Sequence, residues 1–345
     1  MKILVTGDQG YIGSVMVPWL RSRGHQVAGM DNGLYRGCDF GDDIVPESEF
    51  PLDIRDVEVE HLHGFDAVVH LAALSNDPLG SLHPGCTYDI NHHASVRLAE
   101  CAKAAGVERF VYSSSCSVYG AADLSKPLDE TADFAPVTPY AESKVQVEAD
   151  VSRLADDSFS PTFLRNATVY GASPRLRGDL VVNNLTGWAL ATGLVQMKSD
   201  GTPWRPLVHV EDVCEAFTSV LEAHRELIHN EAFNVGHDGE NYKIADVAQL
   251  VTQAIPGSRI DYADGAGPDP RCYRVSFAKL QSKLPQCQMR WNVARGIGQL
   301  VTAFKRVGLA QQDLEGPRYQ RVQTILRLMQ AGNLDSDMRW AVSIA

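Results

Sequence analysis

Short apolar runs alternate, in the first half of the chain, with longer segments in which apolar residues recur about every 3.6 positions. Near-continuous apolar runs are typical of strands buried on both faces of a parallel sheet; they occupy residues 2–6, 26–30, 66–72, 109–114 and 162–167. The intervening amphipathic helices are expected at residues 11–24, 84–106 and 138–155. This alternation predicts an α/β fold, a doubly wound parallel sheet with right-handed crossovers.

The pattern loosens after about residue 172, where proline, glycine and arginine gather in several short stretches. These stretches are 172–178, 201–206 and 265–274. We expect the sheet domain to span residues 1–171 and a smaller lobe to span residues 172–310. This lobe should cover the carboxyl ends of the strands and return in places to the sheet. A helical C-terminal extension is expected over residues 311–345, without a predicted role.

Charge and composition exclude several classes of partner. The 345 residues carry a formal net charge of −12, which opposes binding to nucleic acids and anionic membranes. Neither a signal peptide nor an apolar run of about 18 residues is visible. Seven scattered cysteines lack metal-ligand spacing and are expected to be free thiols. We therefore expect a cytoplasmic protein without a metal site, a membrane span or a nucleic-acid partner.

A glycine-rich turn follows the first predicted strand and opens the first helix. In VTGDQGYIG, Gly7, Gly10 and Gly13 have the spacing G-x-x-G-x-x-G. Such glycines permit a tight turn, close approach of a pyrophosphate to the backbone, and close helix–strand packing. Asp31 ends the second strand, where a carboxylate accepts from a ribose 2′-hydroxyl and repels a 2′-phosphate. The pattern predicts a Rossmann-type domain that prefers NAD to NADP, with Asp53 beside the adenine; a purely structural turn is the alternative.

Tyr140 and Lys144 lie four positions apart in TPYAESK, on one face of a predicted helix. A free tyrosine has a pKa of about 10, so it acts as a base near neutrality only if positive charge stabilises the phenolate. Lys144 and the nicotinamide ring of NAD have the required sign. Solvent-exposed Tyr–Lys pairs on a single helix share this spacing, so the pair alone does not show that the site is catalytic.

Six motifs occur in the order typical of the extended short-chain dehydrogenase/reductase family. They are TGDQGYIG, HLAAL, YDIN, SSSCSVYG, PYAESK and DGTPWRPLVHVEDV. Over residues 1 to about 215 the chain resembles the nucleotide-sugar group of this family. The resemblance implies a catalytic set of Ser115, Tyr140 and Lys144, and cofactor contacts along the matching motifs. The implied NAD contacts are Gly7, Gly10, Tyr11, Ile12, Gly13, Asp31, Asn32, Asp53, Ile54, Leu71, Ala72, Ala73, Asn91, Tyr140 and Lys144.

The residues after Ser115 distinguish branches of the family. The 4,6-dehydratases have an Asp–Glu pair there, whereas this chain has Cys116 and Ser117, which disfavours elimination of water. The GDP-fucose synthase branch has a cysteine two residues after the serine and a histidine partner. Here Cys116 follows directly, and DLVVNNL contains no histidine. We interpret Cys116 as a small packed thiol.

The resemblance places the substrate contacts at Ser115, Thr168, Asn184, Arg205 and Arg271. Both arginines suit a diphosphate clamp, with structural ion pairs as the alternative. Thr168 replaces the asparagine of UDP-galactose 4-epimerases, and Pro206 turns their RDY into RPL, so the base and the sugar stay open. His209, at a predicted strand-to-helix junction, is expected to pack or to cap a helix and not to act as a base.

The leading prediction is an NAD-dependent epimerase that acts at C4 of a nucleotide-diphospho-sugar through a 4-keto intermediate. Tyr140 takes the proton of the 4-hydroxyl, Ser115 orients that hydroxyl, and Lys144 lowers the tyrosine pKa and holds the nicotinamide ribose. The alternatives are a nucleotide-sugar dehydrogenase or 4-ketoreductase, a 4,6-dehydratase, and a catalytically silent NAD-binding scaffold. The resemblance also implies a homodimer that forms through helices 84–105 and 138–155.

Overall fold

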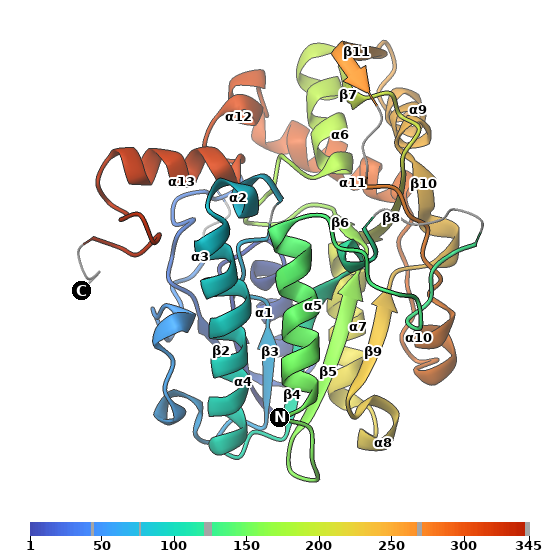
Figure 1. Ribbon diagram of the computed structural model, residues 1–345. Coiled ribbons are helices and arrows are strands. Elements are labelled where there is room, and N and C mark those ends of the chain that lie inside the picture. Colours follow the sequence, from blue (N-terminus) through green and yellow to red (C-terminus); the bar gives the residue numbers. More distant parts are fainter. Residues whose placement is uncertain (43–44, 76, 121–125, 268–270, 342–345) are drawn as a thin grey trace.

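A six-stranded parallel sheet forms the centre of the computed structural model, which describes residues 1–42, 45–75, 77–120, 126–267 and 271–341 (Figure 1). The strand order is β2-β1-β3-β4-β5-β9. The strands are β1 (Lys2–Thr6), β2 (Gln26–Met30), β3 (Ala67–His70), β4 (Arg109–Ser115), β5 (Ser160–Asn166) and β9 (Glu231–Val235). The five predicted strands are therefore confirmed. The sixth strand, β9, comes from the later part of the chain.

Helices cover both faces of the sheet (Figure 1). They are α1 (Gly13–Ser22) and α7 (Val210–Glu222) on one face, and α4 (Ala94–Ala104) and α5 (Pro139–Ser152) on the other. Alternate β1 side chains enter opposite cores: Ile3 and Val5 pack with α1 and α7, and Leu4 packs with α4 and α5. All three are completely buried. The two-sided covering confirms the predicted Rossmann-type fold.

A second group of elements lies beyond the carboxyl ends of the main strands (Figure 1). It has its own apolar core, and its two small sheets have the orders β10-β8-β6 and β11-β7. Its elements are β6 (Thr168–Tyr170), α6 (Val181–Thr192), β7 (Leu194–Ser199), β8 (Trp204–His209), β10 (Asn241–Lys243), α9 (Ile244–Ala254), β11 (Arg259–Gly267) and α11 (Val293–Val307). Ligands of open parallel sheets bind at these carboxyl ends, so this group lies where it can form the outer wall of a binding site.

The remaining helices are short or belong to the C-terminal segment. They are α2 (Asp77–Leu82), α3 (Pro84–Tyr88), a π turn (Asp89–His93), α8 (Arg225–Ile228), α10 (Ala278–Lys283), α12 (Gln311–Glu315), α13 (Arg321–Gln330), and four 3-10 turns at Ile54–Asp56, Val59–Leu62, Cys116–Tyr119 and Asp238–Glu240. Among the described helices, none combines the length and apolar character that a bilayer crossing requires. The described part of the C-terminal segment packs against the sheet domain, because Ile325, Leu334 and Met338 are buried in the same core as α4 and α5.

Candidate active site

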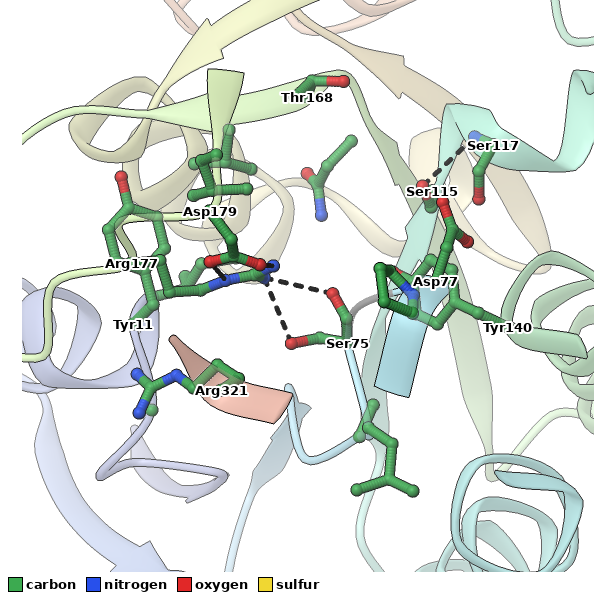
Figure 2. A pocket seen from close by; sticks show the side chains of 18 of the residues that line it. Tyr11, Ser75, Asp77, Ser115, Ser117, Tyr140, Thr168, Arg177, Asp179 and Arg321 are labelled. Carbon is green, nitrogen blue, oxygen red and sulfur yellow. Dashed lines mark hydrogen bonds and ion pairs between the residues drawn. The ribbon is translucent and has the colours of Figure 1, made fainter. Parts of the chain in front are cut away.

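A pocket of about 1030 Å³ lies between the carboxyl ends of the main strands and the second group of elements (Figure 2). Its walls come from segments that are far apart in the sequence, including the glycine-rich turn, the end of β4, the start of α5, and α6. With the exception of Asn91, all of the residues predicted to bind cofactor or substrate line this one pocket. The volume is that of a site for a cofactor together with a substrate.

The glycine-rich turn leaves no room for a side chain at Gly7 or at Gly13. Gly7 has a φ of +72°, and a Cβ there would lie 2.7 Å from the amide nitrogen of Ala72. A Cβ at Gly13 would lie 2.1 Å from the carbonyl oxygen of Gly7. Helix α1 begins at Gly13 without an acidic residue in its first turn, so its N-terminal amides favour an anion. The turn thus fits the diphosphate of a dinucleotide.

The carboxylates at the other end of the pocket differ in how they are engaged. An oxygen of Asp31 accepts a hydrogen bond from the Gly33 amide at 2.7 Å, and burial raises the pKa of this carboxyl group. Asp53 is held by Arg55, whose Nη2 lies 2.8 Å from Oδ2, and also accepts from Asn32 at 3.1 Å. The pocket wall here is consequently a pre-formed polar network, and the roles predicted for Asp31 and Asp53 stay predictions.

Helix α5 positions the tyrosine–lysine pair. Thr138 accepts from the Ala141 amide at 3.2 Å as the N-cap, and Pro139 occupies the first turn, both typical of helix starts. Tyr140 therefore stands at the end of α5 that meets the pocket. One turn later, Lys144 Nζ donates to the carbonyl oxygen of Ser113 at 2.7 Å and lies 5.5 Å from the centroid of the Tyr140 ring.

Ser115 is the last residue of β4, and Figure 2 shows its side chain on the same side of the pocket as that of Tyr140. The Ser115 hydroxyl accepts a hydrogen bond from the Ser117 amide at 3.1 Å, and both Ser115 and Tyr140 line the pocket. Burial and the charge of Asp77 raise the pKa of Tyr140 to about 12, although Ser115 and Arg177 oppose them. The protein alone therefore keeps the phenol protonated near neutrality, so the lowered pKa that we predict depends on positive charge from a bound cofactor.

The pH dependence of stability should report on Lys144. Burial lowers the pKa of its ammonium group to about 7, partly opposed by Glu148. Unfolded chains keep this proton up to about pH 10, so from pH 7 to 9 the unfolded state binds more protons and stability rises with pH. Without cofactor, the unfolding free energy of the wild type should gain about 2 kcal/mol over Lys144→Met in this interval. Urea denaturation measures it, and a constant difference between the two proteins would refute the assignment.

Asn91 does not line the pocket in the part of the chain that the structure describes. Its side-chain oxygen accepts from the Leu74 amide at 2.7 Å, and its nitrogen donates to the Leu74 carbonyl at 3.1 Å. Asn91 itself is completely buried within the π turn. Its side chain thus supports the loop that carries Ala72 and Ala73, both of which line the pocket.

Two negative predictions agree with the structure. Cys116 is completely buried and donates to the Arg165 carbonyl oxygen at 3.1 Å, and burial raises its pKa, so it is a packed thiol. His209 caps α7 by accepting from the Glu211 amide at 3.2 Å, and it stacks on Trp291 with ring centroids 3.9 Å apart. His209 is therefore structural, as expected. All seven cysteines are free thiols.

The predicted substrate contacts meet on the far wall of the pocket. Arg271 Nη1 forms an ion pair with Asp77 at 2.5 Å, and Arg205 donates to the backbone carbonyl of Arg271. Asn184 donates to the Gly178 carbonyl at 2.7 Å, and Thr168 stands at the start of β6. The structure brings these residues together, but their roles toward a ligand stay predictions.

Sequence reasoning did not identify Arg177, which lines the same pocket (Figure 2). Arg177 is bidentate to Asp179, at 3.0 Å and 2.6 Å, and its Nη1 donates to the Ser75 carbonyl at 3.0 Å. The stretch 172–178 attracted notice only as a loop rich in proline, glycine and arginine. The one sequence feature that could have pointed to Arg177 is the nearby Asp179 in RGD, which places two opposite charges on either side of a glycine.

One group of potential metal ligands lies outside the pocket. Among the described residues, His83, Cys86 and Asp337 bring one ligand atom each within 4.8 Å of one another. The Nδ1 atom of His83, however, accepts from the Cys86 amide at 3.0 Å and caps α3. A neutral imidazole has one lone pair, so a metal would have to compete with this cap. We therefore interpret the group as structural.

Comparisons with known proteins agree with this geometry. The model of the NAD dependent epimerase/dehydratase family matches residues 3–236. UDP-glucose 4-epimerase of Neisseria meningitidis serogroup C is 30% identical, over 87% of this chain and 95% of that protein.

Two solved structures have similar folds. MoeE5 in complex with UDP-glucuronic acid and NAD is 28% identical, with a TM-score of 0.77 over 89% of this chain and 99% of that chain. UDP-glucose 4-epimerase of Thermotoga maritima with UDP-glucose is 27% identical, with a TM-score of 0.77 over 89% and 99%. The chain belongs to the NAD dependent epimerase/dehydratase family, as its motifs predict.

Proposed function

We propose that the protein epimerises a nucleotide-diphospho-sugar at C4 through a transient 4-keto sugar, with NAD as its resident cofactor. The observation that carries the proposal is the meeting of Ser115, Tyr140 and Lys144 in the pocket that contains the glycine-rich turn. The curated relatives of similar length that are named UDP-glucose 4-epimerase support the same reaction.

Each of the three side chains has a distinct task in this proposal. The Tyr140 phenol exchanges a proton with the 4-hydroxyl of the sugar, and Ser115, which lines the same pocket, orients that hydroxyl. Lys144 Nζ donates to the Ser113 carbonyl oxygen and lies 5.5 Å from the centroid of the Tyr140 ring, and this ammonium group would hold the nicotinamide ribose. NAD, when bound, supplies a hydride acceptor and donor at C4 and a positively charged ring beside Tyr140.

Two observations weigh against elimination of water. A 4,6-dehydratase needs an acid and a base next to Ser115, and this chain has Cys116 and Ser117 there. The Cys116 thiol is completely buried, and a serine hydroxyl does not ionise near neutrality. The proposal therefore keeps the substrate mass unchanged.

The substrate that we propose first is a UDP-linked neutral hexose. A nucleotide-linked uronic acid is the second candidate, because MoeE5, a structural neighbour, is known in complex with UDP-glucuronic acid and because Arg177 lines the pocket. Asp179 forms an ion pair with this guanidinium at 2.6 Å. Because Asp179 already pairs with this guanidinium, Arg177 would attract a sugar carboxylate less strongly, and we therefore place the uronic acid second.

The test uses purified protein, a panel of UDP-, dTDP-, GDP- and CDP-hexoses and UDP-glucuronic acid, and no added reductant. Products are separated by chromatography and identified by mass. A new peak of unchanged mass supports the epimerase. Loss of 18 mass units would support the dehydratase. A two-unit change that requires added cofactor would support a dehydrogenase or reductase, and NAD binding without turnover of any sugar would support a scaffold.

Three further proposals concern the whole protein. We propose that residues 172–310 act mainly as the substrate lobe, and that the seven free cysteines reflect a reducing cytoplasm. We also propose a homodimer through segments 84–105 and 138–155, whose longest helices, α4 and α5, lie side by side on one face of the sheet (Figure 1). Light scattering should give twice the monomer mass of 37.7 kDa, and a mass of one chain would refute the dimer.

A further inference from the structure

Arg321 is a buried charge that the proposed reaction does not use. It is the first residue of α13, its side chain is 4% exposed, and it lines the pocket on the side of Tyr11, away from Tyr140 (Figure 2). It donates to the Arg175 carbonyl oxygen at 3.1 Å and stacks on Tyr35, with its guanidinium carbon 3.9 Å from the ring centroid.

Four other buried arginines of this protein are each paired with a carboxylate. The pairs are Arg55–Asp53 at 2.8 Å, Arg165–Glu148 at 2.7 Å, Arg175–Asp39 at 3.1 Å and Arg177–Asp179 at 2.6 Å. Among the described residues, no carboxylate lies within ion-pairing distance of Arg321, and its Nη1 has no hydrogen-bond partner. Asp31 and Asp179 interact with the Arg321 charge electrostatically, without an ion-pair contact. A buried, unpaired guanidinium is unfavourable, and a bound anion relieves it.

The surroundings of Arg321 indicate what kind of anion would bind there. Arg175, whose carbonyl Arg321 contacts, donates through Nε to the carbonyl of Gln9 in the glycine-rich turn at 3.0 Å. Tyr35, on which Arg321 stacks, follows Asp31 in the loop after β2. Arg321 is thus connected through Arg175 to the turn suited to a diphosphate, and through Tyr35 to the loop that begins at Asp31.

The segment that carries Arg321 is anchored across this end of the pocket. Arg318 Nε donates to the Asp39 carbonyl at 2.7 Å, ahead of α13. Beyond α13, Trp340 Nε1 donates to the Asn32 carbonyl at 2.7 Å. Gln320 and Val322, the neighbours of Arg321, also line the pocket. The segment therefore crosses from the second group of elements to the edge of the main sheet.

We propose that Arg321 binds the diphosphate of the dinucleotide, which makes the C-terminal segment, residues 316–341, part of the cofactor site. The inference rests on the proposed function only for the identity of the cofactor. It adds a residue that lies outside the family-matched region, residues 3–236. A phosphate would supply the negative charge that no described carboxylate places beside the Arg321 guanidinium. The C-terminal segment would then cover the adenosine end of the cofactor.

The test measures ligand binding by calorimetry on full-length protein freed of cofactor, without any sugar. Arg321→Gln should weaken NAD and ADP-ribose about tenfold or more, as expected for loss of a charge-assisted hydrogen bond, and leave adenosine unchanged. Arg321→Lys should restore part of the loss. Arg327→Gln, an exposed change on the same helix, is the matched control and should bind like the wild type.

Unchanged NAD affinity in a folded Arg321→Gln protein would overturn the proposal. So would a loss seen with NADP but not with NAD, because it would assign Arg321 to a 2′-phosphate. If this variant does not fold, hydrogen exchange of the wild type gives the answer: NAD should slow exchange over residues 316–341 more than adenosine does, and equal effects would overturn the proposal. Failure of every sugar assay would leave these binding results intact, so the two proposals fail separately.

Discussion

Replacing Tyr140 by phenylalanine is expected to lower kcat by about 100- to 10,000-fold, the usual contribution of a positioned acid–base group. The change removes only the phenolic hydroxyl and keeps the ring, whose centroid lies 5.5 Å from Lys144 Nζ. Folding and NAD affinity should therefore stay close to those of the wild type. Steady-state turnover of the substrate found in the panel, together with calorimetry for NAD, measures both quantities.

The neighbouring Tyr112 provides a matched control. Its ring lies 4.5 Å from Lys144 Nζ, and its buried hydroxyl has no hydrogen-bond partner among the described residues. Tyr112→Phe removes the same atom from a tyrosine that also lies near Lys144 but belongs to the apolar core and does not line the pocket, so it should leave turnover unchanged. If Tyr140→Phe kept most of its activity, or if Tyr112→Phe lost as much, Tyr140 would not be the base.

Replacing Gly13 by alanine is expected to abolish measurable NAD binding and to destabilise the fold by about 1–3 kcal/mol, as overpacking does. The new Cβ would lie 2.1 Å from the Gly7 carbonyl oxygen and 2.6 Å from the Asp8 Cα. Because both atoms belong to the backbone, relief requires that the turn separate from α1. Calorimetry with NAD and urea denaturation measure the two effects.

Gly298 is the corresponding control, because it lies in α11 and a Cβ there would meet no atom within 4 Å. Gly298→Ala should raise the unfolding free energy by about 0.5–1 kcal/mol, since alanine is the better helix former. It should leave NAD binding unchanged. Normal NAD affinity in Gly13→Ala would show that the turn does not hold the diphosphate.

The fold of the first half is predictable because its strands are short apolar runs with little ambiguity. Residues 2–6 and 26–30 form β1 and β2 with the predicted bounds. The second half was harder to predict, since β9 joins the main sheet although glycine- and proline-rich stretches surround it in the sequence. Its pairing with β5 depends on a long-range contact, which local patterns do not encode.

The candidate site divides in the same way. Ser115, Tyr140 and Lys144 could be found because fixed motifs carry them. Arg177 and Arg321 could not, because their places in the pocket depend on loops and helices that meet only in the folded chain. The raised pKa of Tyr140 in the cofactor-free protein could not be predicted either, because it comes from burial and from Asp77, and neither effect can be read from spacing.

The most direct test of the account follows the hydrogen at C4. The sugar nucleotide that is turned over is prepared with deuterium at this carbon and incubated with the purified protein in ordinary water. The proposed mechanism predicts that the epimer retains the deuterium at C4, because the hydrogen would pass to the cofactor and return from it within one site. Loss of the label to the solvent, as in epimerisation by proton abstraction from carbon, would contradict the proposed mechanism.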